Sequence, residues 1–394
     1  MRDADTHDAD ALPVRRELED LIHELQAAQR PLLSLYLDVH AGSDPNAPAQ
    51  RADAALRELP LDRAVRERLE RHVLSLVRQT GEGTLVAFAA EDPDDLAVHR
   101  LLRVPPPLPG GARDAVAHWG DPWLTPLELL LANEPPVIAA FVDERRARLF
   151  VQDLGEATEA SSYVRALDTE AWRRFAEHST GTPGQPARGG SGMDAYEARE
   201  DAWTARFVRD LAGQVAGAVA AREGARLVLL GESRRIAQLE EELPTHLRDA
   251  VLTRAPAPAD PDLQASQWRD PLTEVVRSAL HEEDEAYLNR LARDGLTGTG
   301  VVLDALQRGT LELVVVPADH DVEVVRCLGS GWMAEDEAAV RQVCPSDPIE
   351  RVPLKERLLA AVRTGRARLR ILRGPDAKRL QDRIGPIAGL PRGG

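Results

Sequence analysis

The sequence predicts a mixed α/β protein built from three α/β domains. Helical and strand patterns alternate along the chain, which is typical of sheets covered by helices. The chain has 394 residues, enough for two to four domains of about 100–150 residues each. A proline pair at 135–136 and a Pro- and Ala-rich stretch at 254–262 mark the predicted boundaries. The predicted domains are therefore residues 1–134, 135–262 and 263–394.

The first domain is predicted to combine amphipathic helices with short strands. The helix at 14–28 places Leu18, Leu21 and Leu25 on one face. Residues 31–40 alternate with the two-residue period of a strand, with Leu33 and Leu35 on the same side. The predicted elements, in order, are the helix at 14–28, a strand at 31–40, a helix at 50–78 broken near Pro60, and strands at 84–90 and 96–104.

The middle domain is predicted to begin with a hairpin and to contain a long loop at its distal end. The predicted elements are a hairpin at 137–155 turning near Asp143–Arg146, a strand at 162–168, a helix of roughly 25 residues after the loop, and a strand at 225–231. The loop, residues 169–194, is rich in Gly, Pro, Ser and Thr. A stretch of this length without regular structure is usually functional or disordered.

The third domain also alternates between helix and strand. Its predicted elements are helices at 270–293, 301–309, 353–365 and 374–385, strands at 310–317 and 367–373, and an insertion at 323–348. The strand at 310–317 is predicted to be buried. This order predicts a third α/β domain.

Charge and composition exclude several classes of protein. The net charge is −16, which argues against DNA binding and against RNA binding by non-specific attraction alone. No stretch approaches the roughly 20 apolar residues that cross a bilayer, so we expect no membrane partner. The only cysteines, Cys327 and Cys344, cannot build a disulfide framework and fit a reducing compartment. The acidic N-terminus is unlike a signal peptide, so we expect a cytoplasmic protein.

Two adjacent glycines, Gly189 and Gly190, stand inside the predicted loop, between Arg188 and Ser191. Paired glycines cost backbone entropy, so they usually occupy a place where the chain adopts a conformation other residues resist. One interpretation is a reaction centre or the remnant of one. The other is a solvated loop whose glycines have no function.

Three features, in this order, resemble the bacterial branch of the archaeo-eukaryotic class-1 peptide release factor superfamily. They are "PLLSLYLDV" near the N-terminus; "VIAAFVDERRARLFVQDLG" followed by the Gly-Gly loop and a long helix; and "GTGVVLDALQRGTLELVVVP" paired with "ARLRILRGPDAKRLQDRIGPIAGLPR". The resemblance covers residues 31–392. It implies that the last domain has the fold of kink-turn-binding ribosomal proteins.

The resemblance also assigns a role to the loop. Hydrolytic members of the superfamily carry Gly-Gly-Gln at the tip of the middle domain, where the glutamine helps to place a water against the peptidyl-tRNA ester. The aligned positions here are Gly189, Gly190 and Ser191, so the glutamine is absent. Gln185 precedes the glycines in a shifted register, but Pro186 follows it directly.

Members without the tripeptide, such as Pelota and the hibernation factor Balon, act by occupying the ribosomal A site. The resemblance therefore implies a translation factor without hydrolytic activity and without a cofactor, acting in ribosome hibernation or in stalled-ribosome handling and rescue. It implies that the ribosome is the partner, together with a translational GTPase. Stop-codon reading is not expected, because the first domain has no Asn-Ile-Lys-Ser motif.

Basic residues near the loop suggest contacts with ribosomal RNA. Arg188 stands beside the glycines, and Arg199, Arg206 and Arg209 lie on the following helix off its apolar stripe. Nearby carboxylates balance most of this charge. Two alternatives stay open: peptidyl-tRNA hydrolysis through Ser191 or Gln185, and an acidic protein-interaction module that reuses the fold without touching the ribosome.

Residues 326–332 and 343–348 look like the two knuckles of a degraded zinc ribbon. A ribbon needs Cys-x-x-Cys twice, because four thiolates at this spacing give tetrahedral coordination. Here only Cys327 and Cys344 remain, and Ser330 and Asp347 occupy the second-ligand positions. Two cysteines and a carboxylate are a poor structural zinc set. We therefore expect a metal-free insertion in place of the full ribbon that some relatives carry.

Overall fold

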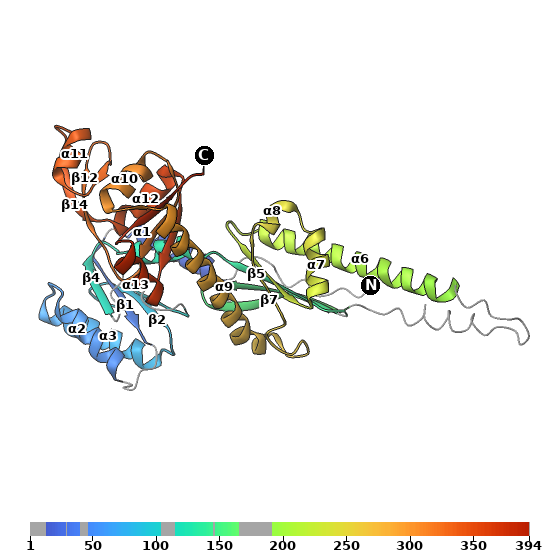
Figure 1. Ribbon diagram of the computed structural model, residues 1–394. Coiled ribbons are helices and arrows are strands. Elements are labelled where there is room, and N and C mark those ends of the chain that lie inside the picture. The colour runs from blue at the N-terminus through green and yellow to red at the C-terminus, as the bar shows by residue number, and fades with distance from the viewer. Residues whose placement is uncertain are drawn as a thin grey trace, which may run out of the picture. The chain divides into compact units, whose positions relative to one another are not determined.

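The computed structural model describes residues 13–28, 30–39, 46–103, 115–144, 146–164 and 191–393 (Figure 1). These residues form a mixed α/β protein with several separate sheets, as predicted. They divide into two compact units. The middle unit contains residues 136–153 and 157–279, and the terminal unit contains residues 13–135, 154–156 and 280–394. The finer division into three domains stays a prediction.

The first part of the terminal unit is a sheet with helices on both faces. Its elements are α1 (Pro13–Gln26), β1 (Leu32–Asp38), α2 (Ala47–Arg57), α3 (Arg63–Gln79), β2 (Thr84–Ala89), β3 (Ala97–Leu102), β4 (Ala115–Gly120) and α4 (Thr125–Asn133). The strands are antiparallel in the order β3-β2-β1-β4. The predicted alternation is confirmed: Leu33 and Leu35 pack with α2 and α3, whereas Tyr36 packs with α1 and α4.

The middle unit holds a five-stranded sheet. Its elements are β5 (Val137–Val142), β6 (Arg146–Asp153), β7 (Glu156–Val164), α6 (Ser191–Ala220), β8 (Arg226–Gly231), α7 (Ser233–Glu242), α8 (Thr245–Arg248), β9 (Val251–Ala255) and the start of α9 (Ala265–Asp294). The strand order is β7-β6-β5-β8-β9. The predicted hairpin is confirmed, since β5 and β6 are antiparallel and the Asp143 N–H donates to the Arg146 carbonyl at 3.0 Å. Helices α6, α7 and α8 contribute to the core on one face of the sheet.

The opposite face of this sheet is covered by the start of α9. Trp268 is fully buried and stacks on Phe150, with 5.0 Å between the ring centroids. The Arg148 guanidinium lies 4.9 Å from both ring centroids, which is within cation–π distance. It also pairs with both carboxylate oxygens of Glu159, at 2.7 and 2.9 Å. It donates to the carbonyls of Pro261, at 3.4 Å, and Leu263, at 2.7 Å. The end of the stretch predicted as a linker is therefore held close to the sheet.

The second part of the terminal unit is another helix-covered sheet with an insertion. Its elements are β10 (Leu296–Thr297), α10 (Thr299–Gln307), β11 (Leu311–Pro317), β12 (Glu323–Cys327), β13 (Met333–Ala334), α11 (Glu337–Val343), β14 (Ile349–Pro353), α12 (Lys355–Gly365), β15 (Arg368–Leu372), α13 (Gly374–Arg383) and β16 (Ala388–Pro391). The main sheet has the order β10-β16-β11-β15, with β11 and β15 parallel. Helices α10 and α12 cover one face, and α13 with the end of α9 covers the other.

The two parts of the terminal unit are joined through the end of α4. The Ile371 N–H donates to the Asn133 side-chain oxygen at 2.6 Å, and the Asn133 amide donates back to the Ile371 carbonyl at 3.4 Å. The Asn133 side chain thus forms with the β15 backbone the two hydrogen bonds that a neighbouring strand would form. Glu134 forms an ion pair with Arg373, and Leu129 is fully buried in the core that contains α10 and α12. These contacts explain why residues from both ends of the chain form one compact unit.

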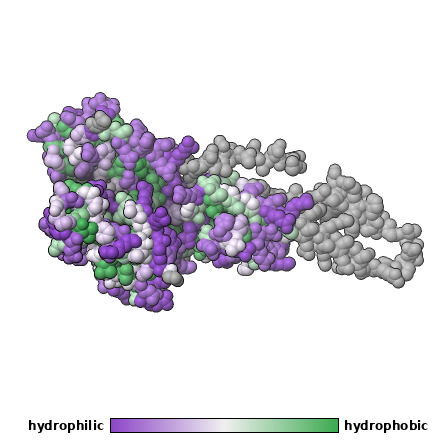
Figure 2. Space-filling model, turned by 90° about the horizontal axis from the view of Figure 1, so that it is seen from above, coloured by the Kyte–Doolittle hydropathy of each residue, from purple (hydrophilic) through white to green (hydrophobic). Residues whose placement is uncertain are grey.

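The surface of the described residues is largely polar. On the face drawn in Figure 2, hydrophilic residues predominate and apolar residues form smaller patches. Among the described residues, the exposed large apolar side chains are Val301, Leu328 and Val343. No helix in this part of the chain combines the length and the apolar composition that a membrane crossing requires.

Candidate functional site

The predicted ribosome-facing loop immediately precedes α6. Arg188, Gly189 and Gly190 lie outside the residues that the structure describes. Ser191 is the first residue of α6, and its side chain also lies outside the description. The interpretation of the loop therefore stays a prediction based on the sequence.

Helix α6 attaches the end of this loop to the middle unit. It spans 30 residues, somewhat longer than the predicted 25. Its second half packs on the sheet through the buried side chains of Val208, Leu211 and Val215. Leu211 and Val215 belong to the apolar stripe that the four-residue spacing predicts for this helix, and Val208 lies beside that stripe. The backbone at Ser191 is therefore continuous with a helix that is anchored in the core.

The predicted rRNA contacts differ in their surroundings. The side chain of Arg199 lies outside the described residues, and Arg206 is exposed. Arg209 is 67% exposed and pairs with Glu242 of α7 at 3.3 Å. An exposed ion pair contributes only about 0–1 kcal/mol, so Glu242 would compete weakly with a phosphate for this guanidinium. Because they lie three residues apart on one helix, Arg206 and Arg209 occupy neighbouring positions on its surface.

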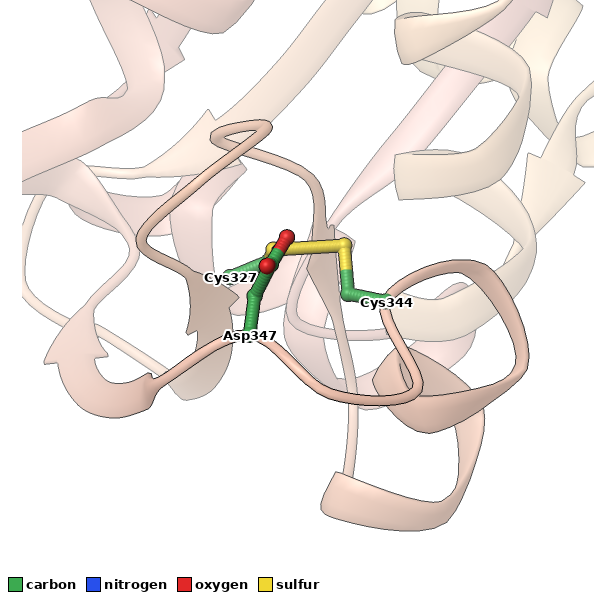
Figure 3. A group of neighbouring side chains, drawn as sticks. All are labelled: Cys327, Cys344 and Asp347. Carbon is green, nitrogen blue, oxygen red and sulfur yellow. A yellow bond between two sulfur atoms is a disulfide. The ribbon is translucent and has the colours of Figure 1, made fainter.

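The four positions of the degraded ribbon come together in the insertion. Cys327 ends β12 and Cys344 follows α11, and their sulfur atoms are joined as a disulfide (Figure 3). The Ser330 hydroxyl oxygen lies 2.9 Å from the Cys344 sulfur. The nearest Asp347 carboxylate oxygen lies 3.5 Å from the Cys327 sulfur.

The disulfide was not predicted, since the two cysteines were expected as part of a reduced protein. Their separation of 17 residues carries no signal that distinguishes a bonded pair from two free thiols. The tertiary structure brings the two Cα atoms within 6.4 Å, a distance that a disulfide spans.

The residues of this cluster do not fit a structural zinc ion. Donor atoms of Cys327, Cys344 and Asp347 lie within 4.8 Å of one another, which is close enough to share a cation. However, zinc binds thiolates, and a sulfur already bonded to another sulfur is not one. Ser330 supplies only a hydroxyl in place of a third sulfur. The ribbon metal implied by the resemblance is therefore not supported by the side chains present.

Glycines shape the turn between β12 and β13. A Cβ atom at Gly329 would lie 2.5 Å from an Asp347 carboxylate oxygen, so only glycine allows this approach without a shift. Gly331 has φ +74°, a left-handed conformation that glycine adopts without strain. The Cys327 N–H donates to the Trp332 carbonyl at 2.8 Å and closes the turn. Gly329 thus leaves room for the Asp347 carboxylate, and Gly331 allows the backbone conformation of the turn.

A buried lysine at the start of α12 is a titratable group that the sequence patterns did not reveal. Lys355 is 4% exposed, and its ammonium group donates to the Ala318 carbonyl at 2.8 Å. The Asp321 carboxylate accepts from the backbone N–H groups of Lys355, at 3.2 Å, and of Val322, at 2.8 Å. Burial lowers the pKa of Lys355 to about 8, and the attraction of Asp321 offsets only part of this effect.

This pKa predicts a pH-dependent stability. The unfolded chain keeps a lysine pKa of about 10.4, so it binds more protons than the folded protein between that pH and about 8. Below about pH 8 the folded protein buries a charged Lys355, which lowers its free energy of unfolding. As the pH rises, the folded protein loses this proton first, so its free energy of unfolding increases. Relative to Lys355→Met, the wild type should gain on the order of 3 kcal/mol of unfolding free energy across this window. Urea unfolding at several pH values measures it.

Lys378→Met, on the exposed side of α13, is the matched control for this measurement. A difference between wild type and Lys355→Met that stays constant across the window would contradict the prediction.

The middle of the chain matches a known family of sequences. Residues 122–283 match the model of bacterial archaeo-eukaryotic release factor family 10. The matched range begins just before α4, contains the described middle unit, and ends within α9. No curated protein matches the chain.

Several solved structures align with most of the chain at low identity. An archaeal translation termination factor, aRF1, is 13% identical, with 96% of this chain and 98% of that chain covered and a TM-score of 0.27. Dom34 of S. cerevisiae is 9% identical, with 95% and 93% covered and a TM-score of 0.36. An archaeal Pelota from a ribosome-bound model with ABCE1 is 14% identical, with 95% and 94% covered and a TM-score of 0.38.

No functional conclusion follows from structural likeness at these scores. The family match over residues 122–283 includes the predicted hairpin, the Gly-Gly loop and the long helix that follows it. This segment of the chain is therefore similar to the bacterial archaeo-eukaryotic release factors of family 10.

Proposed function

We propose that this protein is a translation factor that occupies the ribosomal A site without hydrolysing peptidyl-tRNA. One observation carries the proposal: the segment that matches the release-factor family contains Gly189, Gly190 and Ser191, and the resemblance places Ser191 at the position of the glutamine of hydrolytic members. A serine side chain is shorter than glutamine and has a hydroxyl instead of an amide, so it cannot place the same donor and acceptor beside the ester. Its task would be ribosome hibernation or the handling of stalled ribosomes.

Several finer assignments belong to this proposal. The segment from Arg188 to Ser191 faces the ribosome, and Arg199, Arg206 and Arg209 contact rRNA phosphates. A translational GTPase is the proposed partner, and the cytoplasm is the proposed location. Among these arginines, Arg206 is the best to test, because its described side chain is exposed and Arg209 already has a carboxylate partner.

Co-sedimentation with 70S ribosomes tests the proposal. Lysates of growing and of starved cells are compared on sucrose gradients at several salt concentrations. We expect stoichiometric association in starved cells that weakens as salt rises, because each phosphate contact releases counterions. Arg206→Glu should weaken binding. It should also reduce the slope of log affinity against log salt concentration by about one, the contribution of one phosphate contact. Arg234→Glu, an equal charge change at an exposed position of α7, is the matched control and should leave binding unchanged.

The two alternatives predict different outcomes. Absence from ribosomes in both growth states would favour an acidic interaction module. For hydrolysis through Ser191 or Gln185, the purified protein is added to ribosomes that carry peptidyl-tRNA. We expect no peptide release above background. Release that disappears in Gly190→Ala would overturn the proposal that the protein is not an enzyme.

A further inference from the structure

The insertion between β11 and α12 has only a small apolar core of its own. One side of its sheet, with strand order β13-β12-β14, joins the main core of the domain through Val324, Met333 and Val352. The residues of its other core are few: Val325, Cys327, Ala334, Val340 and Cys344, with Trp332, Ala339 and Ile349 partly buried beside them. A core of this size rarely holds a fold without a disulfide or a metal.

The two cysteines lie at the end of β12 and directly after α11. Cys327 is at the end of β12, where the turn into β13 begins, and Cys344 follows the last residue of the seven-residue helix α11. Their side chains belong to the small core, with exposures of 0 and 3%. A bond between them fixes the helix end against the strand end.

Polar side chains lie close to the two sulfurs. An Asp347 carboxylate oxygen lies 3.5 Å from the Cys327 sulfur, and Figure 3 shows this carboxylate beside the sulfur–sulfur bond. The Arg341 guanidinium donates to the Asp347 backbone carbonyl at 2.7 Å, so it brings a positive charge near the cluster.

We propose that Cys327 and Cys344 form a thiol–disulfide couple that closes the insertion in place of a ribbon metal. The co-reactant is a low-molecular-weight disulfide. One cysteine thiolate attacks it and releases one small thiol, and the second cysteine then attacks the mixed disulfide and releases the other. The two cysteine thiols lose two electrons and two protons, which end on the two small thiols. The reverse exchange opens the insertion.

Trypsin reads the state of this couple directly. It cleaves after Arg326, Arg341 and Arg351, which places the two cysteines on separate peptides, 327–341 and 342–351. The full-length protein is equilibrated with glutathione mixtures from fully oxidised to fully reduced, quenched in acid, alkylated and digested. We expect the two peptides to be linked at the oxidising end and separate, each alkylated once, at the reducing end. Alkylated thiols at every glutathione ratio would overturn the proposal.

Native proteolysis tests whether the couple closes the insertion. Arg341 lies on α11 between the two cysteines and is partly exposed, so trypsin reaches it when the insertion opens. We expect reduction to raise the rate of cleavage at Arg341 by about tenfold or more, because the cross-link no longer restrains the open chain. Equal rates in the oxidised and reduced protein would overturn the closing role.

A variant and a metal analysis complete the experiment. The double variant Cys327→Ser/Cys344→Ser should be cleaved at one rate across the glutathione series, and the wild-type comparison does not depend on how well this variant folds. Zinc is measured by elemental analysis of protein purified from zinc-supplemented cells without chelator. We expect no stoichiometric zinc. One zinc per chain together with two alkylatable thiols would overturn the proposal and restore the metal.

Discussion

Replacement of Trp268 with alanine is expected to lower the free energy of unfolding of the middle unit by about 3–5 kcal/mol. The side chain is fully buried and is the largest buried side chain among the described residues. Its ring stacks on Phe150, and its indole N–H donates to the Asp260 carbonyl at 3.1 Å. The variant would leave a cavity and would remove one hydrogen bond from the Asp260 carbonyl, which keeps the bond from the Leu263 N–H. It would also remove one of the two rings beside the Arg148 guanidinium.

Hydrogen exchange of the β5 and β6 amides is the suitable measurement. The chain has two compact units, so a single melting temperature would not report on one of them. Trp332→Ala, in the insertion of the terminal unit, is the matched control and should leave these amides unchanged. A loss of protection below about 1 kcal/mol in Trp268→Ala would mean that the site collapses around the missing ring.

Glu134→Gln is expected to lower the free energy of unfolding of the terminal unit by about 3 kcal/mol, since it removes the carboxylate that pairs with Arg373 at a largely buried position. The Glu134 and Arg373 side chains are only 20% and 16% exposed. Burial alone would raise the pKa of Glu134, but attraction by Arg373 and Arg370, with hydrogen bonds from Arg373 and Asn133, lowers it overall. The charged form of Glu134 therefore stabilises the fold.

The sign of the pH dependence follows from this lowered pKa. The stabilisation is fully present above the unfolded pKa of about 4.3 and is lost as the pH falls through the folded pKa. Because glutamine resembles protonated glutamate, the wild type and Glu134→Gln should converge in acid. Urea unfolding of both proteins across this range, with hydrogen exchange of β15 as the local probe, measures the difference.

A double variant separates the interaction between Glu134 and Arg373 from the contribution of each side chain alone. Glu134→Gln/Arg373→Met should be less destabilised than the sum of the two single variants, because it leaves no unpaired charge. Additive losses would show that the ion pair contributes nothing beyond the packing of each side chain.

Patterns in the sequence predicted most elements because those elements bury one face or both. The alternation in β1 and the apolar positions at the end of α6 arise from burial on a sheet or against one. The strands at the edges of the sheets were harder to predict from the sequence. β4 was not predicted, and β7 begins at Glu156, six residues before the predicted strand. Both stand at the end of a strand order, where half-exposed residues leave a weak apolar pattern.

The sequence by itself determined the main features of the predicted function: two adjacent glycines, a serine in place of glutamine, and the family segment that contains them. These are properties of neighbouring residues, so they need no coordinates. Only the tertiary structure decided that Cys327 bonds to Cys344 and that Asn133 pairs with Ile371. Such contacts join positions brought together by packing, up to 238 residues apart, and no local pattern encodes which partners meet.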